Sequence, residues 1–205
     1  MKHFSIALLR NFILSSLLIM SGSYSAHAQN KEPYIYGELG VCGASGRYNC
    51  YGTMLNAVFS KNNIITLSFY SATREAQNLP SGFTQNVPQQ TLNLWGLSYG
   101  KVLFLRNAPC LRFILKGGIS LGTATSPANI TEYHLLFVSD YTYSYVQNFV
   151  IGLVLDPAIE FPTGRWFGFS LGPYININDV SSVYGVKVSA MIGKIRSTKH
   201  GYVSY

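Results

Sequence analysis

The stretch that decides the fold is WFGFSLGPYINI, residues 166–177 of a 205-residue chain. Large apolar side chains alternate in it with small or polar ones. The apolar positions are Phe167, Phe169, Leu171, Ile175 and Ile177, and the alternate positions are Gly168, Ser170, Gly172, Tyr174 and Asn176. Because successive side chains of a β-strand point to opposite faces, a period of two residues indicates a strand. We therefore expect residues 166–177 to form a strand with one apolar face.

The same alternation recurs along the chain and is interrupted at regular intervals by turn residues, a pattern typical of consecutive strands. Residues 91–105 are apolar on both faces, so the pattern predicts their extended conformation but not their facing. Eight segments follow the pattern: 34–42, 48–59, 64–72, 91–105, 111–122, 150–161, 166–177 and 184–193.

The face opposite the apolar one carries glycine, serine and isolated charges. A membrane barrel has this arrangement, with apolar side chains toward lipid and a polar lumen, and small residues fit a narrow lumen. Charged residues make up 11% of the chain, against about 25% in ordinary soluble proteins. We expect an all-β, eight-stranded antiparallel up-and-down transmembrane β-barrel. A soluble secreted barrel that binds a small apolar ligand is the alternative, but its cavity would be lined with apolar groups.

The connections between the predicted strands differ in length. Those after strands two, four and six are short, whereas residues 73–90 and 123–145 form long connections after strands three and five. The connections after strands one and seven are of moderate length. Outer-membrane barrels show this asymmetry, with short periplasmic turns and longer extracellular loops. The loops 73–90 and 123–145 are therefore where we expect any extracellular partner to bind.

The first 28 residues predict a secretory signal peptide. Lys2 and Arg10 supply positive charge, residues 12–20 form a short apolar run, and Ala26-His27-Ala28 offers a small-residue cleavage site. The domain organisation is then a signal peptide at 1–28 and a barrel at 29–205. We expect export to the outer membrane of a Gram-negative cell, contact with outer-membrane lipid, and a monomer.

Six inward-facing charges form the most specific pattern in the sequence. Facing residues of an antiparallel pair have a constant sum of residue numbers, and the pairs Arg112/Glu160 and Lys116/Asp156 share the sum 272. Glu38 and Lys187 are candidates for a third pair across the seam that closes the barrel. Because isolated charges are costly in a narrow lumen of low dielectric, we expect an ion-pair network that plugs it. The alternatives are a gate or narrow ion-conducting pore, and an active site at Asp156 and Glu160.

Two prolines and two cysteines bear on local structure. Pro157 and Pro173 fall within predicted strands, and because proline cannot donate to the ladder we expect a bulge or unpaired backbone there. Cys42 and Cys50 flank a predicted turn, so one interpretation for an exported protein is a disulfide across one hairpin, and unpaired thiols are the alternative.

Other functional signals are weak. His134 lies in the long loop and His200 in the tail, and His3 and His27 belong to the signal peptide, so no histidine is placed for a Ser/His/Asp site. Cysteine spacing of the C-x-x-C kind is absent. The sequence contains no basic run of the kind that indicates nucleic-acid binding. We expect a non-enzymatic protein without a metal or cofactor.

The stretches 152–161, 166–174 and 184–194 resemble the small outer-membrane β-barrel proteins of the OmpA/OmpX-like kind in pattern and composition. The resemblance implies an integral outer-membrane protein with a structural, adhesive or unassigned role. The chain departs from many such barrels, which end on an aromatic residue of the last strand. Here the last predicted strand finishes near Ile195, and the aromatic Tyr205 follows an extra tail.

Overall fold

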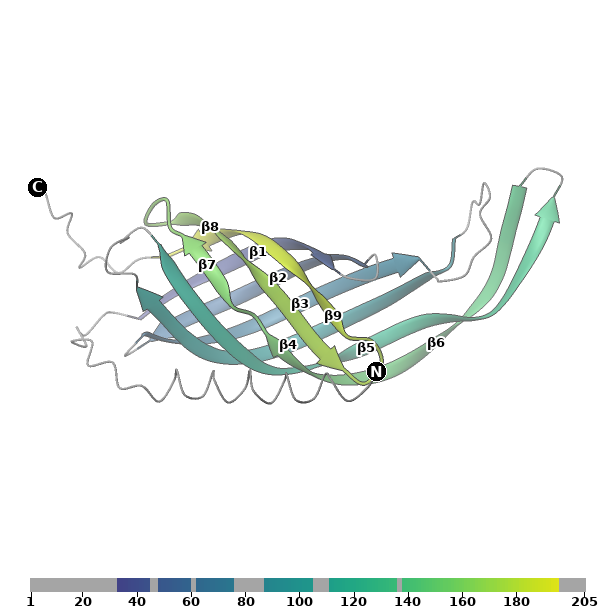
Figure 1. Cartoon of the computed structure of the whole chain (residues 1–205), viewed down its shortest axis with the longest axis horizontal. Coiled ribbons are helices and arrows are strands. Elements are labelled where there is room, and N and C mark those ends of the chain that lie inside the picture. The colour runs from purple at the N-terminus through teal and green to yellow at the C-terminus, as the bar shows by residue number, and fades with distance from the viewer. Residues whose placement is uncertain are drawn as a thin grey trace, which may run out of the picture. The chain divides into compact units, whose positions relative to one another are not determined.

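Figure 1 shows the computed structural model of the protein, which describes residues 33–44, 48–59, 62–75, 87–104, 111–135 and 138–195. The predicted signal peptide, Cys110 and the tail beyond Ile195 lie outside the described residues. Within the described part of the chain, no helix has the length and apolarity needed to cross a membrane.

The described residues form one antiparallel sheet closed into a ring. Consecutive strands pair with each other except β6 and β7, which both pair with β5 and β8, and β1 pairs with β9 to close the ring. β6 and β7 occupy one place in the ring, so its nine strands fill eight positions. The predicted eight-stranded antiparallel up-and-down barrel is confirmed. The strands are β1 (Tyr34–Ala44), β2 (Tyr48–Phe59), β3 (Asn63–Glu75), β4 (Gln89–Phe104), β5 (Arg112–Leu135), β6 (Val138–Leu155), β7 (Ala158–Phe161), β8 (Phe167–Asn178) and β9 (Val183–Gly193).

The break between β6 and β7 falls at Pro157. Leu155 faces Ile175 and Ile159 faces Leu171 on β8, so the register continues unchanged across the break and sets Pro157 opposite Pro173. Neither proline has an N–H group to donate. The strand is therefore unpaired for a short stretch around Pro157 and has no inserted residue there. Pro173 keeps its pairing with β9.

The outward face of the ring is apolar. Most of its large apolar side chains are between 38% and 64% exposed and the others are half-buried, whereas alternate residues are buried in the lumen. The facing of β4 is resolved: Trp95, Leu97 and Tyr99 point outward, and Leu92 and Leu94 are buried inside. This strand looks apolar on both faces because it also supplies apolar side chains to the lumen.

The expectation of a long loop at 123–145 is wrong, because most of it is strand. β5 continues to Leu135 and β6 begins at Val138. β4 pairs with β5 only as far as Thr125, so the rest of the β5–β6 hairpin extends beyond the other strands, as Figure 1 shows. Alternation does not reveal this hairpin, because polar residues occupy both faces of its strands where they extend beyond the core of the barrel. The connection predicted at 73–90 is also shorter, since β3 runs to Glu75 and β4 starts at Gln89.

Candidate functional site

Six charged side chains meet inside the barrel, each at most 3% exposed. They lie between two apolar and aromatic clusters, and buried polar side chains such as Ser120 and Asn176 share the lumen with them. On β1, for example, Glu38 is placed between Tyr36 of one cluster and Cys42 of the other. The lumen is therefore less polar than the alternation suggests. The charged residues are Glu38, Arg112, Lys116, Asp156, Glu160 and Lys187.

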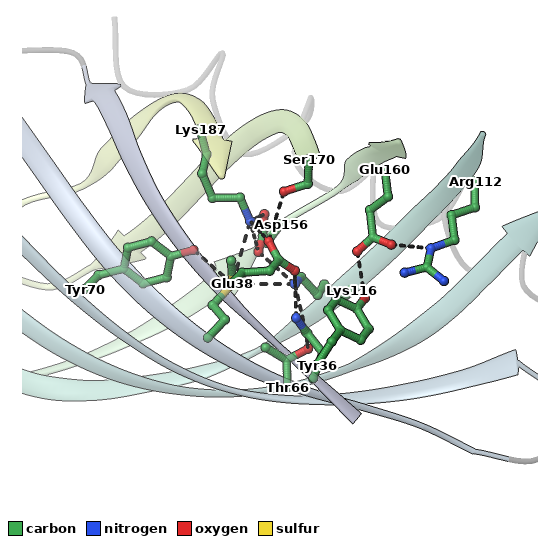
Figure 2. A network of polar contacts seen from close by, with 12 residues as sticks. Tyr36, Glu38, Thr66, Tyr70, Arg112, Lys116, Asp156, Glu160, Ser170 and Lys187 are labelled. Atoms are coloured by element: carbon green, nitrogen blue, oxygen red, sulfur yellow. Dashed lines mark hydrogen bonds and ion pairs between the residues drawn. The ribbon is translucent and has the colours of Figure 1, made fainter. Parts of the chain in front are cut away.

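Asp156 is the centre of the network in Figure 2. Lys187 donates to both of its carboxylate oxygens at 2.7 Å, and Lys116 Nζ lies 3.2 Å from Oδ2. Asp156 directly precedes the proline at the strand break, yet its N–H still donates to the carbonyl oxygen of Lys116 at 2.9 Å. The backbone thus fixes the carboxylate between two lysines that come from opposite sides of the β6/β7 strand.

Glu38 is held mainly by neutral donors. Asn56 Nδ2 donates to its Oε1 at 2.6 Å, and Ser170 Oγ donates to Oε2 at 3.0 Å. Lys116 and Lys187 are more distant, at 3.8 and 3.9 Å. The register sets Glu38 against Met191 rather than Lys187, so the seam does not place these two charges face to face. Lys187 forms the predicted ion pair with Glu38 at the longer distance of 3.9 Å and makes its shortest contacts, at 2.7 Å, with Asp156, a partner that the sequence did not predict.

Arg112 and Glu160 form a second group nearer the end at which β9 finishes. The register places them directly opposite, and Arg112 Nε donates to Glu160. Tyr36 donates to the other carboxylate oxygen at 2.6 Å. Arg112 Nη1 also donates to Tyr34 Oη at 3.0 Å and to the carbonyl oxygen of Ile195 at 2.7 Å. The guanidinium therefore connects β5, β7, β1 and the segment that follows β9.

The charges alone do not identify the neutral members of the network. Thr66 donates to Asn56 Oδ1 at 2.6 Å, and Asn56 in turn donates to Glu38. Tyr36, Asn56 and Ser170 all fall on the inward parity of their strands, which is the only sequence signal that marks them. Parity says that a side chain enters the lumen but not which group it meets there.

Cys42 and Cys50 occupy opposite positions of β1 and β2, with Cα atoms 5.0 Å apart, and are joined by a disulfide. Both face the lumen and are buried. Among the described residues no group of three or more His, Cys, Asp or Glu side chains is arranged to hold a metal ion.

No protein-family model and no curated protein sequence matches the chain. Among solved structures, it is similar to the N-terminal β-barrel domain of Pseudomonas aeruginosa OprF, at 9% identity and a TM-score of 0.51, over 81% of this chain and 98% of that one. Other matches are Ail of Yersinia pestis (11% identity, TM-score 0.45, 80% and 98% covered) and neisserial surface protein A (12%, 0.47, 79% and 96%). The closed ring of eight positions and the OprF similarity lead to one conclusion: the chain has the fold of the small outer-membrane β-barrels.

Proposed function

We propose that this protein is an integral outer-membrane β-barrel whose lumen is closed by the buried charge network. The observation that carries the proposal is the inversion of the usual distribution of side chains. Leucine, isoleucine and aromatic side chains cover the outside of the ring, while six charges are buried inside it. Soluble monomers rarely expose a continuous apolar belt, whereas lipid solvates one.

Membrane insertion is tested by carbonate extraction and by gel mobility with and without heating. The proposal expects the protein to stay in the membrane fraction and to migrate differently when unheated, because a folded barrel resists detergent. Recovery of the folded protein in the carbonate-soluble fraction would support the soluble barrel instead.

Closure of the lumen is supported by its packing. The three cations and three anions of the network neutralise one another, and aromatic pairs such as Tyr70 and Tyr174, with ring centroids 4.1 Å apart, fill the space beside them. Planar-bilayer recordings test this closure. A plug predicts no steady current in wild type. Discrete channels in wild type that change in Lys116→Ala would favour the alternative, a gated pore.

A second role, binding of a partner protein, is favoured by the projecting β5–β6 hairpin. Among the described strands, β6 pairs with β8 only from Gly152 to Leu155, so residues 142–151 have a paired strand on the β5 side alone. Such an edge offers unpaired backbone groups to an added strand. On the β5 edge, Pro127 and a register shift between Ala128 and Thr131 hinder pairing with an added strand. Residues 138–151 of β6 contain no proline.

Site-specific photo-crosslinking in cells tests this role. A crosslinker at Thr142 on β6 should capture a defined partner, and Thr131, the position opposite it on β5, should capture much less of it. Equal capture from the two edges, or none from either, would refute recognition at the β6 edge.

A further inference from the structure

The exposed charges of the barrel are separated between its two ends. We call the end that carries the connections β2–β3, β4–β5 and β7–β8 the short-connection end. Its charged residues outside the lumen among those described are Lys101, Arg165 and Lys194. The sequence adds Lys61 and Arg106 in two of these connections, and no Asp or Glu occurs in 59–63, 101–111, 162–166 or 193–195. Lys31 and Glu32, which precede β1 in the sequence, have opposite charges and add no net charge.

The opposite end of the barrel carries more acidic than basic residues. Glu75 and Asp179 are exposed there, with Arg74 half-buried beside them. In the sequence, Glu132 and Asp140 belong to the β5–β6 hairpin and Arg47 belongs to the β1–β2 connection, so this end carries four acidic and two basic residues. Because the six lumen charges balance, the positive excess of the barrel strands and connections is concentrated at the short-connection end.

The cations at this end are set among exposed aromatic side chains. Lys101 shares the outward face of β4 with Tyr99, which is 51% exposed. The guanidinium of Arg165 lies 5.3 Å from the ring centroid of Trp166, which is 59% exposed. Aromatic rings on a membrane barrel mark the boundary between hydrocarbon and headgroups. Cations next to such rings are at the level of lipid phosphates.

Backbone hydrogen bonds hold part of this surface in place. Ile195 N–H donates to the carbonyl oxygen of Arg165 at 2.9 Å, and Gly193 N–H donates to that of Trp166 at 3.0 Å. Lys194 lies between these two anchored residues, and its own N–H donates to Ile35 at 3.0 Å. Arg165, Trp166 and Lys194 are therefore presented together on a fixed backbone.

We propose that the short-connection end binds the phosphate headgroups of anionic glycerophospholipids in the leaflet it faces, with Arg165, Trp166 and Lys194 as the best-defined contact. This inference rests on the proposed membrane location. A lipid is favoured over a soluble polyanion because the cations adjoin the apolar belt, where a headgroup and its acyl chains are satisfied together.

The two tryptophans of the chain provide the test. Trp166 reports on the short-connection end, and Trp95 lies on the outward face of β4 toward the opposite end. Trp95→Phe leaves Trp166 as the sole fluorophore, and Trp166→Phe leaves Trp95. Each purified variant is reconstituted in phosphatidylcholine vesicles that contain increasing fractions of acyl-brominated phosphatidylglycerol or of acyl-brominated phosphatidylcholine, and quenching is compared at equal bromine content.

The expected result is an apparent preference of Trp166 for the brominated anionic lipid of about fivefold, the effect of roughly one cation at an anionic surface. High salt should reduce this preference because it screens charges. Lys194→Gln should reduce it as well, whereas Arg74→Gln, which removes a charge at the opposite end, should not. Trp95 should be quenched equally by the two lipids.

Equal quenching of Trp166 by the two lipids would overturn the inference, and so would a preference that Lys194→Gln leaves unchanged. The same preference at Trp95 would overturn it too, because the effect would then not be local. Absence of quenching of Trp95 by either lipid is a distinct failure, since it would contradict membrane insertion itself.

Discussion

Replacement of Asp156 by asparagine removes the anion that holds two buried lysines while keeping nearly the same shape. In the native lumen Lys187 lies 2.7 Å from both Asp156 oxygens and Lys116 lies 3.2 Å from one of them. After the substitution only Glu38 remains for the two ammonium groups, at 3.8 and 3.9 Å. One positive charge is then uncompensated in a region at most 3% exposed.

Loss of one partner of a buried ion pair destabilises a protein by about 3–5 kcal/mol. Because about 1.4 kcal/mol corresponds to a factor of ten, the unfolding equilibrium of Asp156→Asn should shift by about two to three and a half orders of magnitude. Urea unfolding of the protein in lipid vesicles, followed by tryptophan fluorescence, measures this shift. The exposed Asp179→Asn, at the end of the barrel, is the matched control and should change stability by no more than about 0.5 kcal/mol.

The double variant Asp156→Asn/Lys187→Met distinguishes charge from shape. It restores neutrality and fills the site with an apolar chain, so its stability should return to within about 1–2 kcal/mol of wild type. If Asp156→Asn is too unstable to unfold reversibly, the folded yield on gels should be low for the single variant and recovered in the double. An Asp156→Asn protein as stable as Asp179→Asn, or a double variant less stable than the single, would refute the reasoning.

Three further predictions concern the barrel wall. Gly172→Ala places a Cβ against the carbonyl oxygen of Pro157 and should cost about 1–3 kcal/mol, whereas Gly43→Ala meets nothing within 4 Å and should be neutral in the same urea assay. Reduction of the Cys42–Cys50 disulfide, which closes a separation of 8 residues, should lower stability by about 2 kcal/mol, and an unchanged urea midpoint after reduction would contradict a role in stability. Replacement of residues 127–145 by a two-residue Asn-Gly turn should leave heat-modifiable mobility intact, because among the described strands this part of β5 and β6 pairs with no third strand; loss of the folded band would show that the hairpin supports the barrel.

The sequence alone determines the strands and the facing of most of them. Alternation is a local property, so Phe169 and Leu171 can be placed outside and Ser170 inside without any tertiary information. The register of β5 against β6 and β7 also follows from sequence, because Arg112 and Lys116 have the same spacing as Glu160 and Asp156 and buried charges need partners. The unpaired stretch at Pro157 follows from the missing N–H group.

Only the closed barrel decides which lumen groups meet. Lys187 lies closer to Asp156, at 2.7 Å, than to Glu38, at 3.9 Å, because strands that are not neighbours face one another across a narrow lumen, and side-chain length and ring curvature set these distances. The apolar lumen positions Leu92 and Leu94 and the continuation of β5 and β6 past the rim are equally hidden from the pattern. Alternation shows which side of a strand a residue occupies. It does not show which residues of other strands face that residue across the lumen, and the charge network is formed by those contacts.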